Sequence, residues 1–419
     1  MRFPCGSRLQ PPSWPPVTTC ATRPGAESGT THLRVEVVDR LASVDPAEWD
    51  ALAGDDDPFV EHALLNAFET SRSVGRGTGW EPLHVVVRRD GKLVAAAPLY
   101  AKSHSYGEYI FDWGWASAAQ RAGIRYYPKL LSAVPFTPAT GRRLLVEGGA
   151  TTGPAFEALV GGIHAVAEQV GVSSIHWLFL TADEHAALAA REDFLARTTY
   201  QFHFTNPGYA SFDDYLGAMR SSARKEIRRE RRKAAESGLT LSTKRGTDLT
   251  DTEWKALFRF YTDTAARKGA IAYLTQRFFD EVRRTLPHRV VAALASRGSE
   301  PVAGALAFHK GRQLFGRYWG ALDDFEALHF ELCYYRLIEY AIEHRITRFE
   351  AGAQGEHKLK RGLLPSPTYS IHWIRHPGLA EAIAEYLPRE TRSVEAEMDY
   401  FAEHSPFRRT EPGAPGIDE

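Results

Sequence analysis

The feature that most constrains the fold of this chain is an internal repeat. Residues 93–102 (LVAAAPLYAK) match residues 301–310 (PVAGALAFHK), and residues 110–115 (IFDWGW) parallel residues 314–319 (LFGRYW). In each half a long helical pattern and a short apolar strand follow these segments. Self-similarity of this kind is the signature of a duplicated structural unit. The sequence therefore predicts two α/β units of similar architecture within the 419 residues.

Each half is predicted to have the element order of a GNAT acyltransferase domain, in which two strands, a third strand, a helix and a short strand form the central run. The pair Asp90-Gly91 is a tight hairpin signal between two of these strands. The expected fold class is α/β, with tandem duplicated GNAT-like domains that each have a mixed sheet and helices on both faces. The predicted organisation is a disordered segment at 1–32, domains at 33–205 and 206–378, a basic helix at 211–236 in the second domain, and a C-terminal helix and tail at 379–419.

Bulk properties are those of a cytoplasmic globular protein. Hydrophobic residues make up 43% of the chain, which is enough for a buried core. The formal net charge of -1 gives no global attraction to nucleic acid, so any polyanion site is local. The 3 cysteines show no metal-binding spacing, and no apolar run is as long as a membrane span. Prolines interrupt the N-terminal residues, which argues against a signal peptide. We expect no metal site, and nothing in the sequence indicates the oligomeric state.

Several segments resemble the FemAB-like family, whose members are labelled peptidoglycan biosynthesis/recognition. The resemblance extends from residue 57 to residue 375 and covers nearly the whole folded chain. It implies a two-domain N-acyltransferase of the GNAT superfamily. The segments are 57–59 (DPF), 101–109 (AKSHSYGEY), 126–129 (YYPK), 134–138 (VPFTP) and 349–358 (FEAGAQGEHK).

The second half is also similar to the Fem peptidyltransferases, which add amino acids from aminoacyl-tRNA to a peptidoglycan precursor. Residues 219–229 (MRSSARKEIRR) and 358–362 (KLKRG) resemble two of their segments, although Leu359 and Leu363 replace aromatic residues. The resemblance implies transfer of an acyl or aminoacyl group to an amine acceptor, either a small molecule or a peptidoglycan precursor. It implies acyl-CoA or aminoacyl-tRNA as the co-substrate, and no tightly bound cofactor.

The candidate catalytic segment is 354–362 (QGEHKLKRG), which follows a predicted strand. Ligand groups gather beyond strand ends in α/β sheets. Glu356 and His357 are candidate bases for the proton of an amine, because the reference pKa of imidazole is about 6.5 and burial raises that of a carboxyl group. The alternative is a charged turn between glycines. The cations that are candidates to hold a phosphate or a developing oxyanion are Lys358, Lys360 and Arg361.

A run of cations in the predicted basic helix is the candidate polyanion site. Residues four apart share a helix face, and Arg can hold a phosphate with two hydrogen bonds. Arg224 and Arg228 are therefore expected to contact a phosphate-bearing substrate. The alternative is a solvated face with Glu–Arg pairs. A rival function is a non-catalytic recognition protein that binds a cell-wall precursor or RNA through this helix. The full stripe comprises Arg220, Arg224, Arg228 and Arg232.

Residues 102–109 (KSHSYGEY) combine a nucleophile, a base and an acid. Catalytic triads are assembled from distant segments, and no GxSxG elbow is present, so a hydrolase is not supported. We expect either a structural hairpin or a binding surface between the two halves. In the second case Lys102, His104 and Tyr106 contact the substrate.

The pyrophosphate-binding loop typical of acetyl-CoA-dependent GNAT domains is not apparent. The corresponding segment, 320–327 (GALDDFEA), contains three acidic residues that would repel a pyrophosphate. Residues 115–123 (WASAAQRAG) in the first half are only a partial match. Acyl-CoA as the donor therefore has no support from its usual motif.

Overall fold

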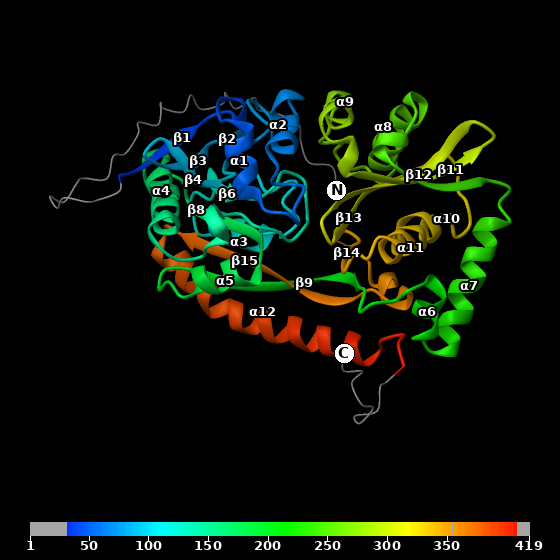
Figure 1. Cartoon of the computed structure of the whole chain (residues 1–419). Coiled ribbons are helices and arrows are strands. Elements are labelled where there is room, and N and C mark those ends of the chain that lie inside the picture. The colour runs from blue at the N-terminus through cyan, green and yellow to red at the C-terminus, as the bar shows by residue number, and fades with distance from the viewer. Residues whose placement is uncertain (1–31, 354, 409–419) are drawn as a thin grey trace, which may run out of the picture.

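The computed structural model describes residues 32–353 and 355–408. One sheet of four strands and one of eleven form its framework. The two halves lie side by side, and the larger sheet runs through both of them (Figure 1). The segment expected to be disordered lies outside the described residues except for His32, as do the last residues of the predicted tail. The predicted α/β class is confirmed.

The small sheet and its helices form the outer part of the first half. Asp45 begins α1, because its side chain accepts hydrogen bonds from the backbone N–H groups of Ala47 and Glu48. The predicted hairpin between β3 and β4 is confirmed at Asp90 and Gly91, whose φ values of 52° and 87° suit a two-residue turn. The strand order is β1 (Leu33–Val38), β3 (His84–Arg89), β4 (Lys92–Ala97) and β7 (Leu145–Val146). The helices are α1 (Pro46–Ala53), α2 (His62–Thr70), α3 (Trp113–Arg121), α4 (Pro154–Val170) and α5 (Ala182–Ala189).

The large sheet contains strands of both halves. Strands of the second half make up one end of it, and short strands of the first half make up the other. Its order is β10 (Thr240–Arg245), β11 (Val290–Arg297), β12 (Glu300–Lys310), β13 (Gln313–Ala321), β14 (Arg348–Glu350), β9 (Leu195–Thr205), β15 (Leu364–Ile374), β8 (Ser174–Leu180), β6 (Lys129–Ser132), β5 (Tyr100–Lys102) and β2 (Trp80–Pro82).

The central strands β9 and β15 join the halves, because each of them pairs with strands of the other half. β15 belongs to the second half but pairs with β8 and β9 of the first. β9 in turn pairs with β14 of the second half. The long helix α12 (Pro377–Glu403) runs along both strands (Figure 1), and two hydrogen bonds of 2.7 Å tie Arg197 of β9 to Glu390 of α12. The predicted domain boundary after residue 205 coincides with the end of β9.

The duplication is visible in the topology, although one part of the predicted repeat is wrong. In both halves an antiparallel pair is followed by a parallel one, β5–β6–β8 in the first and β12–β13–β14 in the second. The counterpart of β13 is therefore β6, whereas residues 110–115 form a loop and the start of α3. β12 passes through a bulge between Leu306 and Ala307. At the matching position Pro98, which has no N–H to donate, interrupts the strand, and β4 and β5 enter different sheets.

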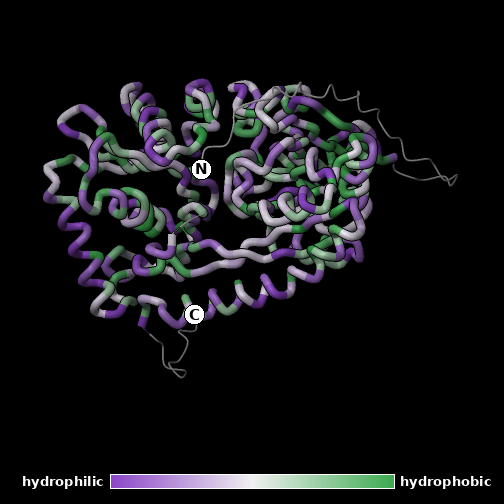
Figure 2. The backbone as a smooth tube through the Cα atoms, turned by 180° about the vertical axis from the view of Figure 1, so that it is seen from behind, coloured by the Kyte–Doolittle hydropathy of each residue, from purple (hydrophilic) through white to green (hydrophobic). Residues whose placement is uncertain are grey.

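The helices of the second half cover both faces of its sheet, with α8 and α9 on one and α10 and α11 on the other (Figure 1). The single basic helix predicted at 211–236 is wrong, because the extended backbone of Arg220 separates α6 from α7. Figure 2 shows α7 as a mostly hydrophilic helix at the outer edge of this half. The helices are α6 (Phe212–Gly217), α7 (Ser221–Ala235), α8 (Asp251–Arg267), α9 (Gln276–Thr285), α10 (Leu328–Phe330) and α11 (Arg336–Glu343), with a π-helical turn at Glu331–Tyr335 between the last two.

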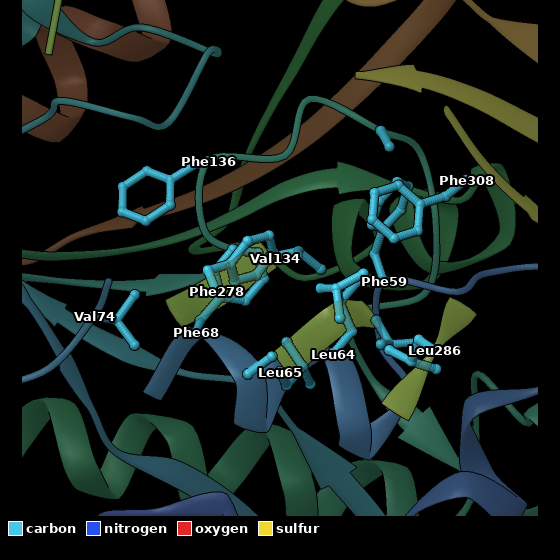
Figure 3. Close-up of a cluster of buried hydrophobic side chains, with 14 of the residues drawn as sticks. Phe59, Leu64, Leu65, Phe68, Val74, Val134, Phe136, Phe278, Leu286 and Phe308 are labelled. Carbon is cyan, nitrogen blue, oxygen red and sulfur yellow. The ribbon is translucent and has the colours of Figure 1, made fainter. Parts of the chain in front are cut away.

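The halves share a hydrophobic core as well as a sheet. Figure 3 shows the part of this core in which aromatic side chains of α2 and its flanking loops meet those of α9 and β12. The rings of Phe68 and Phe278 are stacked with centroids 4.7 Å apart, and those of Phe59 and Phe308 meet edge-on at 5.3 Å. Such buried aromatic pairs stabilise an interface beyond the area they bury. We therefore expect the two halves to unfold together.

Replacing Phe68 by Ala tests this shared core. The substitution leaves a cavity against Phe278, and we expect it to lower the free energy of unfolding by about 3–5 kcal/mol in one transition. Urea denaturation followed by circular dichroism measures both quantities. Tyr386→Ala on α12 is the control, because that ring is 50% exposed and its loss changes stability by only about 0.5 kcal/mol or less. A second, unshifted transition in Phe68→Ala would mean that the halves are stable independently.

Candidate active site

A cleft of about 790 Å³ lies between the two halves. We call it the central cleft. Its first-half wall is the loop that precedes α3, together with residues around Phe136. Its second-half wall comes from α8 and the loop after it, from β12 and β13, from the π-helical turn, and from the chain that follows β14. A volume of this size is typical of pockets for small-molecule substrates.

The divergence of two parallel strands opens the central cleft. β13 and β14 pair only over Gln313–Phe315 and Arg348–Glu350. Beyond these residues both chains contribute to the lining of the cleft, with Gly316–Trp319 from one and Ala351–Ala353, Gly355, His357 and Lys358 from the other. Ligands of open α/β sheets bind beyond the carboxyl ends of the strands. The cleft therefore occupies the position at which this sheet is best suited to bind a substrate.

Lys358 is the one buried lysine or arginine of the described chain that has no carboxylate partner. Taking a charge out of water is costly unless an opposite charge or hydrogen bonds compensate it. The five others are each within salt-bridge distance of a carboxylate. These pairs are Lys102–Glu108 at 3.7 Å, Lys129–Glu108 at 2.8 Å, Arg143–Asp57 at 3.5 Å, Lys310–Glu61 at 2.7 Å and Arg361–Glu230 at 2.6 Å.

The ammonium group of Lys358 instead lies at the wall of the central cleft. It donates one hydrogen bond, to the carbonyl oxygen of Gly352 at 2.6 Å. Burial lowers the pKa of Lys358 to about 8, so the group is mostly protonated at neutral pH. An anion in the cleft would supply the negative charge that no described residue provides.

His357 also lines the central cleft and carries the chemistry of a proton acceptor. Its Nε2 lies 2.9 Å from the hydroxyl oxygen of Tyr334. Burial, together with the charges of Arg361 and Lys358, lowers the pKa of His357 below its usual value. The shift favours the neutral imidazole. When Nε2–H donates to Tyr334, Nδ1 is left with a free lone pair that can accept a proton.

Three other residues of the candidate segment lie elsewhere. Residues 356–361 form a 3₁₀-helix, in which side chains three apart share a face. Glu356 and Lys360 are exposed and are not among the described residues that line the cleft. Arg361 is buried on the same face as Lys358, but it is held by Glu230 and by the carbonyl oxygen of His357, each at 2.6 Å. Arg361 thus ties the 3₁₀-helix to α7.

Arg224 and Arg228 lie on α7, on the outer edge of the second half, and do not line the central cleft. Arg228 is exposed and its one ion pair, with Asp213, has a length of 3.5 Å. The inward face of the helix is different, because Arg231 there binds the carboxylates of Glu331 and Glu339. The outward face of α7 remains available to a polyanion.

The loop that resembles the FemAB-like family at 102–109 is held by a buried charge network. Lys129 of β6 binds Glu108 at 2.8 Å, the hydroxyl of Ser105 at 2.9 Å and the carboxylate of Asp112. Tyr126 donates to Asp112 at 2.6 Å. Two lysines face two carboxylates in this network, while Glu108 Oε1 and Asp112 Oδ1 have no hydrogen-bond partner among the described residues. Its geometry fixes the loop against the sheet.

The three residues of this loop that were predicted to contact the substrate, Lys102, His104 and Tyr106, lie in different surroundings. Lys102 is fully buried over the ring of Trp80 and donates to the carbonyl oxygen of Tyr106 at 3.1 Å. Burial lowers the pKa of Lys102 to about 7 and that of His104 to about 4. Only Tyr106 lines the central cleft. Lys102 and His104 therefore hold the loop in place, and Tyr106 faces the cleft.

The two segments compared with a pyrophosphate-binding loop have the following structures. The acidic residues between β13 and α10 are exposed to solvent or paired on the surface, as Glu326 is with Lys233. The partial match at 115–123 is not a loop at all, since these residues lie mostly within α3 and their amides are used by the helix.

Two cleft cations were missed by the sequence analysis, Lys268 at the end of α8 and Arg317 on β13. Lys268 lies in no motif, and Arg317 lies in the repeat segment 314–319, which gave no indication that its side chain reaches a cleft. Within the described ranges no group of three His, Cys, Asp or Glu side chains is arranged to hold a metal ion. None of the described helices has both the length and the apolar character needed to cross a bilayer.

Comparison with known proteins agrees with this architecture. The family model FemAB-like, described as peptidoglycan biosynthesis/recognition, matches residues 40–409. Among solved structures, FemX is similar with a TM-score of 0.50 and 14% identity, over 81% of this chain and 98% of its own. The C-terminal domain of a putative lysylphosphatidylglycerol synthetase from Agrobacterium fabrum gives 0.53 and 11%, over 82% and 95%. No protein with a curated description matches.

At these identities the two structures establish a shared fold, and the family match covers most of the chain. The reaction class expected from the resemblance, acyl or aminoacyl transfer, agrees with both findings. The chain belongs to the FemAB-like family and shares the mixed α/β fold of FemX.

Proposed function

We propose that this protein transfers an acyl or aminoacyl group to an amine within the central cleft. The observation that carries the proposal is the unpaired, buried ammonium group of Lys358 at the cleft wall. A fixed positive charge in a water-poor site stabilises negative charge far better than it would in water. The tetrahedral intermediate of acyl transfer carries such a charge on its oxygen.

The chemistry follows from the two adjacent cleft residues. The amine nitrogen of the acceptor attacks the carbonyl carbon of the donor, and the carbonyl oxygen becomes an oxyanion next to Lys358. His357 Nδ1 accepts the proton that the amine loses. When the intermediate collapses, the bond from the carbonyl carbon to the leaving oxygen or sulfur breaks, and the proton passes from His357 to that atom. An amide and a free alcohol or thiol are the products.

The donor is more consistent with an aminoacyl ester of tRNA than with acyl-CoA. The acidic segment 320–327 is unfavourable for a pyrophosphate. The exposed cations of α7, in contrast, form a continuous surface that suits a phosphate backbone. A peptidoglycan precursor is the acceptor suggested by the description of the family. We assign Glu356 and Lys360 no role in the reaction, because neither side chain lines the cleft.

Substitutions of Lys358 and His357 test the proposed roles. We expect Lys358→Met to lower kcat/KM about 10²–10³-fold, as the loss of an oxyanion contact does. His357→Gln should lower kcat about 10²-fold. The matched controls are Lys360→Met and Glu356→Gln, the exposed neighbours, which should retain parental kinetics. The assay measures amide formation from aminoacyl-tRNA or acyl-CoA donors and an amine.

Melting curves of the same variants separate catalysis from folding. Because Lys358 has no carboxylate partner, Lys358→Met should keep or raise the melting temperature while activity is lost. Lys129→Met, which breaks a buried ion pair, should instead cost about 3–5 kcal/mol. A strongly destabilised but active Lys358→Met would mean that this lysine is structural and that the reaction occurs elsewhere.

A second candidate function is recognition of RNA by α7 without catalysis. It is favoured by a concave surface of about 700 Å³ on this helix, lined by four cations and one acid. Polyanion binding there predicts an affinity that falls with salt as counterions are released. The lining residues are Ser222, Lys225, Glu226, Arg228, Arg229 and Arg232.

Charge reversal on α7 tests this surface. We expect Arg228→Glu/Arg232→Glu to weaken tRNA binding at least tenfold and to reduce its salt dependence. Arg389→Glu/Arg392→Glu on α12 changes the net charge equally and is the control. Filter binding at several salt concentrations gives both quantities. Equal losses in the two double variants would indicate only a general charge effect, and unchanged binding in the α7 variant would leave a solvated helix face.

A further inference from the structure

We propose that the mouth of the central cleft binds the apolar body of a substrate whose anionic end lies near Lys358. The substrate class is thus an anionic amphiphile, a carboxylate or phosphate attached to a hydrocarbon chain or ring. The inference rests on the proposed function for the reaction at Lys358, but binding can be measured without turnover. We call Tyr106, Phe111, Trp113 and Ile271 the rim.

The first argument is the distribution of exposed apolar side chains. The described chain has six large hydrophobic residues that are well exposed, and four of them form the rim. Their exposed fractions are 49% for Tyr106, 40% for Phe111, 40% for Trp113 and 58% for Ile271. The two others lie on α12. Exposed apolar groups that gather at one place mark a binding site, whereas scattered ones need no explanation.

The second argument is the construction of the loop that carries three of these side chains. Its acidic residues, Glu108 and Asp112, turn inward to Lys129. The aromatic residues between and beside them line the cleft instead. Gly107 is required where the loop crosses Phe136, because a Cβ atom there would lie 2.6 Å from that ring. A buried ion network thus holds an apolar surface in contact with solvent, which costs free energy unless a ligand covers it.

The third argument is charge complementarity. None of the described residues lining the central cleft is Asp or Glu. Its cations Lys268, Arg317 and Lys358 form no ion pair with any described carboxylate. Burial lowers the pKa of His329 to about 4, and the charges of Lys268 and Lys358 contribute to this shift. Both cations therefore lie close enough to the imidazole to affect it. Lys268 is exposed and lies three residues from Ile271 of the rim, whereas Lys358 is buried, so the cleft attracts an anion at the buried Lys358 and has apolar side chains at its mouth.

The space between these two ends is also apolar. Leu274, Leu306 and Leu337 line it, and the rings of Phe136 and Tyr273 are stacked with centroids 4.6 Å apart. A hydrocarbon chain or a ring that extends from Lys358 to the rim would be covered along its length. The position and length of this apolar body would set the specificity of the transfer reaction.

Isothermal titration calorimetry with two homologous series tests the proposal. The probes are butyrate, hexanoate, octanoate and decanoate, and the alkyl phosphates of the same chain lengths, below their micelle concentrations. In the parent protein we expect each added methylene to tighten Kd by up to roughly fourfold, the value for full burial of a CH₂ group. The head group that binds more tightly identifies the anion. Phe111→Ala/Trp113→Ala should flatten the chain-length dependence.

Matched variants make the result decisive. Tyr386→Ala/Tyr400→Ala removes two equally exposed aromatic rings on α12 and should leave the chain-length dependence intact. Lys358→Met should weaken every probe by a similar factor without changing the slope. A slope that is absent in the parent, or that the α12 variant abolishes as well, would overturn the proposal.

A chain-length dependence without acyl transfer from any donor would leave the binding site valid and overturn the proposed function. If Lys358→Met loses turnover but the parent shows no chain-length dependence of Kd, the proposed function would stand and the apolar binding site would be overturned.

Discussion

The pairing of β9 with β15 is the interaction on which the rest of the structure depends. Each of these strands comes from one half and extends the sheet of the other, so that neither GNAT-like unit is complete alone. The backbone hydrogen bonds between them fix the angle and spacing of the halves, and α12 supports them from one side. The central cleft exists because β14, at the end of this shared region, pairs with β13 over only three residues before the two chains diverge.

The buried cations of the protein lie in two kinds of environment, with and without a carboxylate partner. In the interior, positive charges are matched: Lys129 with two carboxylates, Arg143 with Asp57, and Lys310 with Glu61. At the cleft the matching stops, and Lys358 is left with a single carbonyl oxygen. A chain that pairs its other buried cations has the means to pair this one as well. Among the described residues Lys358 lacks a carboxylate partner, and this asymmetry is what links the fold to the proposed reaction.

Sequence reasoning succeeded where a local pattern determines a local structure. Asp90-Gly91 forms the predicted turn, because these residue types tolerate the positive φ values that a two-residue hairpin requires. It failed at β9, which was not recognised although Tyr200, Phe202 and Phe204 alternate in it, because its partners lie in the distant second half. It failed at 110–115 because aromatic residues that line a cleft resemble those of a buried strand.

The site was predicted only in part, because tertiary structure decides which side chains reach the cleft. The segment after β14 was identified because it follows a strand end, and His357 and Lys358 do line the cleft. A 3₁₀-helix then directs the neighbouring Glu356 and Lys360 to solvent, which sequence proximity cannot reveal. Lys268 and Arg317 are isolated cations, brought to the cleft by tertiary structure.

The titration of Lys358 tests the central claim most directly. Nitrogen-15 NMR of the labelled lysine side chains, assigned with Lys358→Arg, gives the pKa of this ammonium group with and without an anionic ligand. We predict a pKa near 8 in the free protein, because burial without a partner disfavours the charge. Binding of decanoate or decyl phosphate should raise the pKa by at least about one unit, since a nearby anion favours the charged form. An unchanged pKa in the ligand-saturated protein would contradict the account.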